Sequence, residues 1–197
     1  FGLALLLTRK LRGTNIFRTV FFMPNLIGGI VLGYIWQILI NCVLTLVEQP
    51  LLALNATAGY WGMIILMCWQ QIGYMMIIYI SGIQNIPGEL IEAAKIDGAN
   101  SRQVLRKVII PMVMPSITIC TFLTLTNGFK LFDQNLALTN GAPSKMSELL
   151  ALNIFNTFYG RAGYEGVGQA KAVIFFLIVG LVAVIQNRMT RSKEVQQ

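Results

Sequence analysis

The sequence predicts an all-α membrane protein with several spans, and three observations support this. Hydrophobic residues make up 55% of the chain and charged residues 12%, whereas about a quarter of a soluble domain is charged. No charge occurs between Arg18 and Glu48, between Glu48 and Glu89, or between Lys107 and Lys130. The hydrocarbon core holds no water to bond the backbone, so apolar runs of about 20 residues must cross it as helices.

These runs predict about four complete spans. They reach from about Thr19 to Ile40, Trp61 to Ile83, Ile109 to Phe129, and Ala172 to Gln186. The last is short, and we expect Lys171 and Arg188 to extend from its ends to the interface.

Residues 1–7 are too short to cross a bilayer, and we interpret them as a partial N-terminal span, the end of a helix that begins earlier. A signal-peptide remnant is the alternative, but its apolar region would end at small residues, not at Thr8-Arg9-Lys10. The chain is thus expected to form one transmembrane domain, residues 1–197, that is incomplete at its N-terminus.

Lysine and arginine predict the orientation of the spans. If the spans alternate, three clusters share one side: Arg9, Lys10, Arg12 and Arg18; Lys95, Arg102, Arg106 and Lys107; and Arg188, Arg191 and Lys193. The other side holds Lys130, Lys145, Arg161 and Lys171. Eleven against four makes the first side cytoplasmic. The loop of about 85–111 and the C-terminus are then cytoplasmic, the loop of about 132–168 lies outside, and the net charge of +7 requires no nucleic-acid partner.

Several chemistries are missing from the sequence. It has no histidine, and Cys42, Cys68 and Cys120 are isolated in or beside apolar runs, so their spacing fits neither a metal site nor a disulfide framework. No GxxxxGK[ST] phosphate loop is present. We therefore expect no catalytic residues, no metal and no cofactor in this chain, and any nucleotide must be bound by another chain.

Polar residues and glycines interrupt the apolar spans. Those of the second and third spans that could line a substrate path are Gln70, Gln71, Gly73, Tyr74, Thr124, Asn127 and Gly128. Polar groups at that depth must face protein or water, so interhelical hydrogen bonds and a solute path both remain open. For Gly28, Gly29 and Gly33 in the first span, close helix packing is favoured over a substrate role.

The cytoplasmic loop from Glu89 to Pro111 predicts two short helices joined by a sharp turn. Pro87 suits a first helical turn, and Glu89 and Glu92 favour its positive end. Gly98 ends this helix, and Ser101 is expected to cap a second one that extends to Val108. From these residues alone, the loop could equally be a plain connector at the membrane surface.

The same loop closely resembles the EAA motif of ATP-binding-cassette (ABC) importer permeases. Glu92-Ala93-Ala94 is followed by Gly98 and then by Val108-Ile109-Ile110-Pro111, in the order and at the spacing of that motif. Val108 and Ile110 replace its usual Ile and Leu. The longer string from Ile86 to Ala99 is similar to the sugar-permease branch, the maltose and glycerol-phosphate type.

Weaker similarities follow in order along the whole chain. They are Arg18 to Asn25 with Trp36, Phe129 to Asp133, Thr139 to Pro143, and Gly168 to Ala172. Asn140-Gly141-Ala142 departs from the glycine triplet that is usual in such permeases, which puts the geometry of that turn in doubt.

The resemblance implies a type I ABC importer transmembrane domain with a cytoplasmic coupling helix, in a bacterial inner membrane. The resemblance implies that a set of residues contacts the ATPase or transmits its movement to the spans. These residues are Glu89, Glu92, Ala93, Ala94, Asp97, Gly98 and Pro111. The implied partners are a homologous permease, two ATP-binding subunits that carry ATP and Mg²⁺, and an external binding protein. The chain itself would translocate a sugar or related carbohydrate.

Three alternatives remain open at this stage. One is a permease for another small solute. Another is an ion-coupled secondary transporter, which predicts carboxylates within the membrane or an inverted repeat, and neither is evident in the sequence. The third is a scaffold with no transport role.

Overall fold

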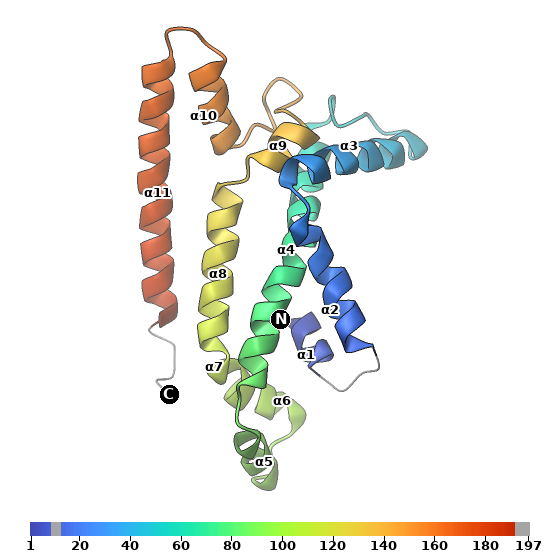
Figure 1. Ribbon diagram of the computed structural model, residues 1–197, viewed down its shortest axis with the longest axis vertical. Coiled ribbons are helices and arrows are strands. Elements are labelled where there is room, and N and C mark those ends of the chain that lie inside the picture. The colour runs from blue at the N-terminus through green and yellow to red at the C-terminus, as the bar shows by residue number, and fades with distance from the viewer. Residues whose placement is uncertain (9–12, 192–197) are drawn as a thin grey trace. The chain divides into compact units, whose positions relative to one another are not determined.

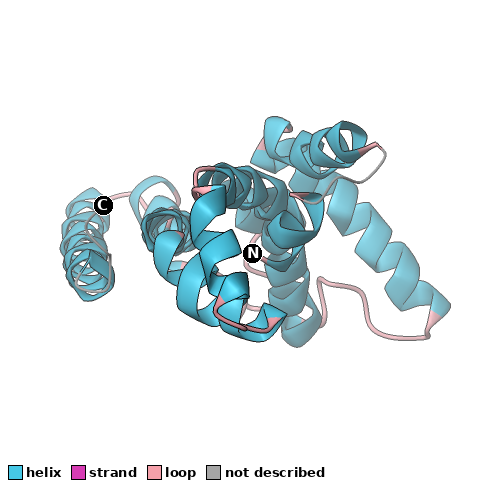
Figure 2. Ribbon diagram, turned by 90° about the horizontal axis from the view of Figure 1, so that it is seen from below, coloured by secondary structure: helices cyan, strands magenta, loops and turns pink. Residues whose placement is uncertain are grey.

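The computed structural model describes residues 1–8 and 13–191, with the side chain of Arg191 excepted. Helices joined by loops make up this described part, which contains no strand (Figure 2). Arg9, Lys10, Arg12 and Lys193, which contribute to the predicted orientation, lie outside the described residues.

The helices follow one another along the chain as Figure 1 labels them. They are α1 (Gly2–Leu7), α2 (Thr14–Phe22), the 3₁₀ helix η1 (Met23–Leu26), α3 (Gly29–Leu46), α4 (Ala56–Gln84), α5 (Gly88–Ile96), α6 (Ser101–Val104), the π-helix η2 (Leu105–Ile109), α7 (Ile110–Met112), α8 (Met114–Phe129), α9 (Asp133–Leu138), α10 (Leu150–Tyr159) and α11 (Glu165–Arg191). Within the described residues, α3, α4 and α11 are long and apolar enough to cross a membrane. Ser101–Met112 and Met114–Phe129 add a fourth candidate if this bent pair counts as one span.

The first predicted span, Thr19 to Ile40, is wrong as a single helix. Helix α2 ends at Phe22, a 3₁₀ turn follows, and α3 begins only at Gly29. Pro24 has no backbone N–H to donate, and Gly28 adopts an extended conformation (ψ 142°) as the N-cap of α3. Hydropathy alone does not detect this break, because the residues on both sides of it are apolar.

The last predicted span was placed correctly but made too short. Helix α11 begins at Glu165, so Lys171 lies inside the helix and not at its end. The extension of Lys171 to the interface stays a prediction, and the structure shows partners for its ammonium. The ammonium donates to Asn153 Oδ1 and Thr157 Oγ1, both at 2.8 Å, and thereby joins α11 to α10.

The described contacts divide the chain into two compact units. Unit 1 comprises Phe1–Met23, Ile72–Leu125 and the chain from Val182 onward, and unit 2 comprises Pro24–Gln71 and Thr126–Leu181. Helices α4, α8 and α11 each contribute to both. The single membrane domain over residues 1–197 remains a prediction.

The core of unit 1 joins α1 to the second half of α4. Ala4 and Leu7 pack there against Met76 and Ile80, and all four are buried. Arg18 Nη2 on α2 donates to the Leu7 carbonyl oxygen at 2.9 Å, an oxygen left free by the end of α1. The short N-terminal helix is thus held by both apolar burial and a hydrogen bond.

In unit 2, glycines allow α3 and α9 to approach closely. A Cβ on Gly29 would lie 2.8 Å from Asp133 Cβ, and one on Gly33 would lie 2.5 Å from Ala137 Cβ. Glycines four residues apart share one helix face, so this face of α3 has no side chains to hold α9 away. Packing is therefore the observed role of Gly29 and Gly33.

A buried amide on α9 anchors the loop that follows it. Asn135 is 0% exposed. Its Nδ2 donates to the Ser147 carbonyl at 2.8 Å, and its Oδ1 accepts from the Leu149 amide at 2.9 Å. The loop needs left-handed backbone at Asn140 (φ 47°) and Gly141 (φ 81°). Asparagine tolerates this region, so the departure from a glycine triplet fits the turn.

Candidate functional site

The Glu89–Pro111 loop begins with one short helix that ends in a tight glycine turn. Helix α5 has nine residues, about 13 Å at 1.5 Å per residue, with Glu89 in its first turn and Lys95 in its last. Both charges complement the helix dipole. Gly98 then adopts φ +79°, and the Ala99 amide donates back to the Ala94 carbonyl at 3.0 Å. Glycine suits this position because other residues rarely adopt such a φ.

The second helix of the loop is capped by Asn100, and the prediction of Ser101 as the cap is wrong. Asn100 Oδ1 accepts from the Gln103 amide at 3.0 Å, and Gln103 Oε1 accepts from the Asn100 amide at 2.8 Å. This reciprocal pair satisfies two backbone donors that the helix start would leave free. The Asn-x-x-Gln spacing is the sequence pattern that predicts such a cap.

Beyond the cap, the helix leads without interruption to a bend before α8. Helices α6, η2 and α7 form one continuous segment, Ser101–Met112, longer than the predicted Ser101 to Val108. It meets Met114–Phe129 at 68°, with Val113 fully buried at the corner. Pro111 and Pro115 flank Val113 and cannot donate hydrogen bonds, so the helical ladder is weakest there.

The predicted coupling residues fall into three groups. Ala94, Asp97 and Gly98 line a groove of about 320 Å³. Its other lining residues are Ala99, Gln103, Val104, Lys107 and Val108. Glu89, Glu92 and Ala93 are exposed on α5 outside this lining, and Pro111 lies in α7.

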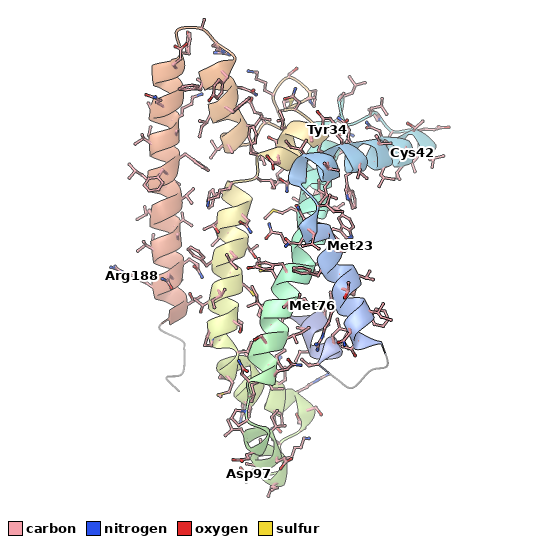
Figure 3. The ribbon with its side chains drawn as sticks, viewed as in Figure 1. Met23, Tyr34, Cys42, Met76, Asp97 and Arg188 are labelled. Carbon is pink, nitrogen blue, oxygen red and sulfur yellow. The ribbon has the colours of Figure 1, made fainter. Side chains whose placement is uncertain are left out.

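Apolar side chains are also exposed at the tip of the loop. Ile96 is 85% exposed beside Asp97, and Asp97 is labelled at the end of this segment in Figure 3. Ile96 lies between Lys95 and Asp97, so an apolar side chain is exposed between two charged residues at this tip.

Of the polar span residues, Gln71 and Asn127 pair in unit 2. Asn127 Nδ2 donates to Gln71 Oε1 at 3.3 Å, and this contact is exposed. Gln70 is engaged differently. Its Nε2 donates to the Ile27 carbonyl at 3.2 Å, and its Oε1 accepts from Gln134 Nε2 at 2.7 Å. Gln70 therefore stabilises the break before α3, and Gln134 is a partner that the sequence analysis missed.

The remaining predicted path residues differ in their surroundings. Gly73 is buried in unit 1, and any Cβ there would overlap the carbonyl oxygen of Phe21. Tyr74 is 37% exposed. Thr124 Oγ1 donates to the Cys120 carbonyl at 2.8 Å. In unit 2, a Cβ on Gly128 would lie 3.5 Å from Met67 Cε, an ordinary packing distance.

A charged network at the start of α10 was also missed. The Glu148 carboxylate accepts from Asn153 Nδ2 at 2.7 Å and from Asn156 Nδ2 at 2.5 Å. Burial alone would raise the pKa of Glu148, but these two bonds and the charges of Lys145 and Lys171 lower that pKa below its ordinary 4.5. Asn153 thus bonds both Glu148 and Lys171. The residues of this network lie too far apart in the sequence to form a recognisable motif.

Long apolar helices, polar amides on two of them and a two-helix loop define a helical protein of the membrane-spanning class. The chain belongs to the family of binding-protein-dependent transport system inner membrane components, which it matches over residues 1–193. This confirms the ABC importer permease family suggested by the sequence. Members of this family are transport components and not enzymes, and they work with an ATPase and a binding protein.

Two relatives show how far the similarity extends. The chain is 48% identical to the probable starch degradation products transport system permease protein AmyD of Thermoanaerobacterium thermosulfurigenes, covering 99% of this chain and 69% of the relative. It is 33% identical to the multiple sugar-binding transport system permease protein MsmF of Streptococcus mutans, covering 96% and 68%.

Solved structures share the fold. A bacterial ABC transporter that imports the acidic polysaccharide alginate matches with a TM-score of 0.82 at 17% identity, over 96% of this chain and 70% of that one. Its complex with an alginate pentasaccharide-bound periplasmic protein matches with a TM-score of 0.80 at 18% identity. The all-helical importer-permease fold is therefore confirmed, while the number of spans and the coupling helix remain predictions.

Proposed function

We propose that this chain is the permease subunit of an ATP-driven importer that translocates a carbohydrate delivered by an external binding protein. The observation that carries the proposal is the 48% identity, over 99% of the chain, with a permease named for starch degradation products. MsmF, named for multiple sugars, supports the same class of solute. A short maltooligosaccharide is accordingly the first solute to test.

We place the energy source of the importer on partner chains. The complex would contain a homologous permease, two ATP-binding subunits that hold ATP and Mg²⁺, and one external binding protein. The Glu89–Pro111 loop and the C-terminus would face the cytoplasm of a bacterium. The basic residues beside the apolar helices support this orientation.

The loop would act as a rigid coupling element between the ATPase and the spans. Exposed Glu92 and Ala93 on α5 are free to contact a partner. The continuous helix Ser101–Met112 ends at the bend before α8. A displacement of this helix would therefore reach α8 at Val113, as a rigid-body movement about a defined corner.

Crosslinking should identify the partner of α5. With Cys42, Cys68 and Cys120 replaced by alanine, a single Ala93→Cys substitution should crosslink to an ATP-binding subunit in the assembled complex, because Ala93 is exposed on the proposed docking face. Mass spectrometry of the crosslinked product identifies the partner. Ala53→Cys, exposed in the segment before α4, should yield no such product. Labelling of Ala93→Cys by lipid probes alone would show that the loop is a surface connector.

We place the solute path at the Gln71–Asn127 pair, which joins α4 to α8 in unit 2. Tyr74 and Thr124, both exposed in unit 1, are separate candidates. Amides donate and accept hydrogen bonds at once, as a sugar hydroxyl does. The Gln71–Asn127 contact is exposed and, at 3.3 Å, long, so a solute hydroxyl can replace it. Gln70, Gly73 and Gly128 pack against protein and would support the path without lining it.

Removal of one of these amides should weaken solute recognition. Asn127→Ala should raise the half-saturating maltotriose concentration for transport between about twofold and about twelvefold, since one hydrogen bond contributes about 0.5–1.5 kcal/mol and 1.4 kcal/mol is a factor of ten. Uptake by vesicles containing the complete complex measures this value. Asn187→Ala removes an exposed amide from α11 and should leave it unchanged. An Asn127→Ala variant that assembles poorly but keeps the wild-type value would show that Asn127 is a packing residue.

A further inference from the structure

Unit 1 contains a second groove that the coupling loop does not use. It has a volume of about 300 Å³ and lies between α4 and α8, at the lower end of the range of about 300–1,000 Å³ for small-molecule sites. Its lining residues are Met75, Tyr79, Cys120, Thr121, Thr124 and Leu125. Only Thr124 was among the path residues predicted from sequence, so the groove adds an aromatic ring, a thiol and a second hydroxyl.

The polar atoms of this groove retain capacity for a ligand. Thr121 Oγ1 donates to the Ile117 carbonyl at 2.7 Å, and Thr124 Oγ1 donates to the Cys120 carbonyl at 2.8 Å. Each hydroxyl proton is therefore in use while its oxygen lone pairs can still accept. Cys120 Sγ lies 3.8 Å from the Met75 carbonyl, a weak bond, and the Tyr79 hydroxyl contacts this thiol. The groove is thus rich in acceptors.

This lining differs from a surface that faces lipid. The exposed residues in the middle of α11, from Val173 to Ile185, are all apolar, and they include Ile174, Phe176, Leu177, Ile178 and Leu181. An aromatic ring beside two hydroxyls and a thiol is instead typical of a small-molecule site, in which apolar walls carry a few placed polar groups. Polar atoms at membrane depth indicate a water-filled or solute path.

We propose that this groove is a second binding position for the carbohydrate, in which the Tyr79 ring packs against a sugar ring and the Thr121 and Thr124 oxygens accept from its hydroxyls. The proposal rests on the carbohydrate-importer function. Along the unbroken helix α4, Tyr79 follows Gln71 by about two turns toward the Glu89–Pro111 loop.

Cys120 makes the groove testable by thiol protection. In the complete complex, with Cys42 and Cys68 of this chain replaced by alanine, a small maleimide should label Cys120 slowly, because this thiol is 3% exposed. Maltotriose at about ten times its half-saturating concentration should slow the labelling about tenfold, because only about one site in eleven is then free. Peptide mass spectrometry of this chain over time gives the rate.

A matched variant separates local protection from a general effect of the sugar. With Cys68 and Cys120 replaced, exposed Cys42 on α3 should be labelled at the same rate with and without maltotriose. Tyr79→Ala should abolish the protection of Cys120 while assembly of the complex is retained. Unslowed labelling of Cys120, or equal slowing at Cys42, would overturn the proposed groove.

The two hypotheses fail in different ways. If maltotriose stimulates the ATPase of the complex but does not protect Cys120, the carbohydrate-importer function stands and this groove is not a binding position. If maltotriose and other starch-derived oligosaccharides neither stimulate the ATPase nor protect Cys120, a starch-derived solute is wrong for this importer, and so is the groove as a binding position for it.

Discussion

A Glu92→Lys substitution should abolish most solute-stimulated ATP hydrolysis by the complete complex. Glu92 is exposed on α5, so the new charge does not disturb the fold of this chain. Reversing a charge at a docking face removes an attraction and adds a repulsion, and losing one buried charge partner alone costs about 2–5 kcal/mol. We therefore expect at least about a tenfold fall in the stimulated rate, since 1.4 kcal/mol is a factor of ten. The measurement is ATPase activity in proteoliposomes with the sugar-loaded binding protein.

The control is Glu48→Lys, the same charge reversal at an exposed residue after α3. It should retain the wild-type rate if the effect of Glu92→Lys is local to α5. Glu92→Asp keeps the charge and should recover part of the activity. Wild-type stimulation by the Glu92→Lys complex would exclude a coupling role for this residue.

The second large effect is expected at Gly73. A Gly73→Val substitution should destabilise the chain, because even its Cβ would overlap the Phe21 carbonyl, and backbone cannot give way as a flexible side chain does. Overpacking of a filled core costs about 1–3 kcal/mol, and the backbone contact places Gly73→Val at the upper end. This corresponds to a fall in Tm of about 6–12 °C for a chain of this size. Thermal unfolding of the purified complex in detergent measures it.

Gly180→Val supplies the matched control for Gly73→Val. Gly180 lies in α11, and a Cβ at this position would have nothing within 4 Å, so the same added side chain should leave Tm almost unchanged. An unchanged Tm for Gly73→Val together with altered solute selectivity would show that Gly73 lines the solute path and is not a packing residue.

The features predicted best from sequence are those that depend only on residues close together along the chain. Pro87 and Gly98 delimit α5 through backbone chemistry that is independent of the rest of the fold. Helix α4 was likewise predicted from the length of its apolar sequence. This was sufficient because a helix satisfies its own backbone hydrogen bonds without a partner. The EAA resemblance predicts what local physics cannot, a partner for a loop that could otherwise be a connector.

The errors arose where the decisive atoms are remote or where hydropathy cannot discriminate. The helix break at Pro24 lies within apolar sequence, so a hydropathy window passes over it. The position of Lys171 inside α11 depends on Asn153 and Thr157 of α10, and no periodicity pairs these residues. The Asn100 cap is an error that local sequence could have prevented, because Asn-x-x-Gln is itself a helix-start signal.

The roles of the polar span residues needed the fold as well. Gln70 and Gln71 are adjacent in sequence, yet Gln70 bonds the Ile27 carbonyl and Gln134, while Gln71 pairs with Asn127 in an exposed contact. The sequence indicates that such groups need partners but does not indicate which of them face protein.

The main conclusion is that this chain moves a carbohydrate with energy supplied by a partner ATPase. Uptake of labelled maltotriose by vesicles that contain the complete complex and the binding protein tests it most directly. We predict uptake that requires ATP on the side of the Glu89–Pro111 loop, persists when ion gradients are collapsed, and is lost with Glu92→Lys. Uptake that continues without ATP and stops when an ion gradient is collapsed would contradict this conclusion.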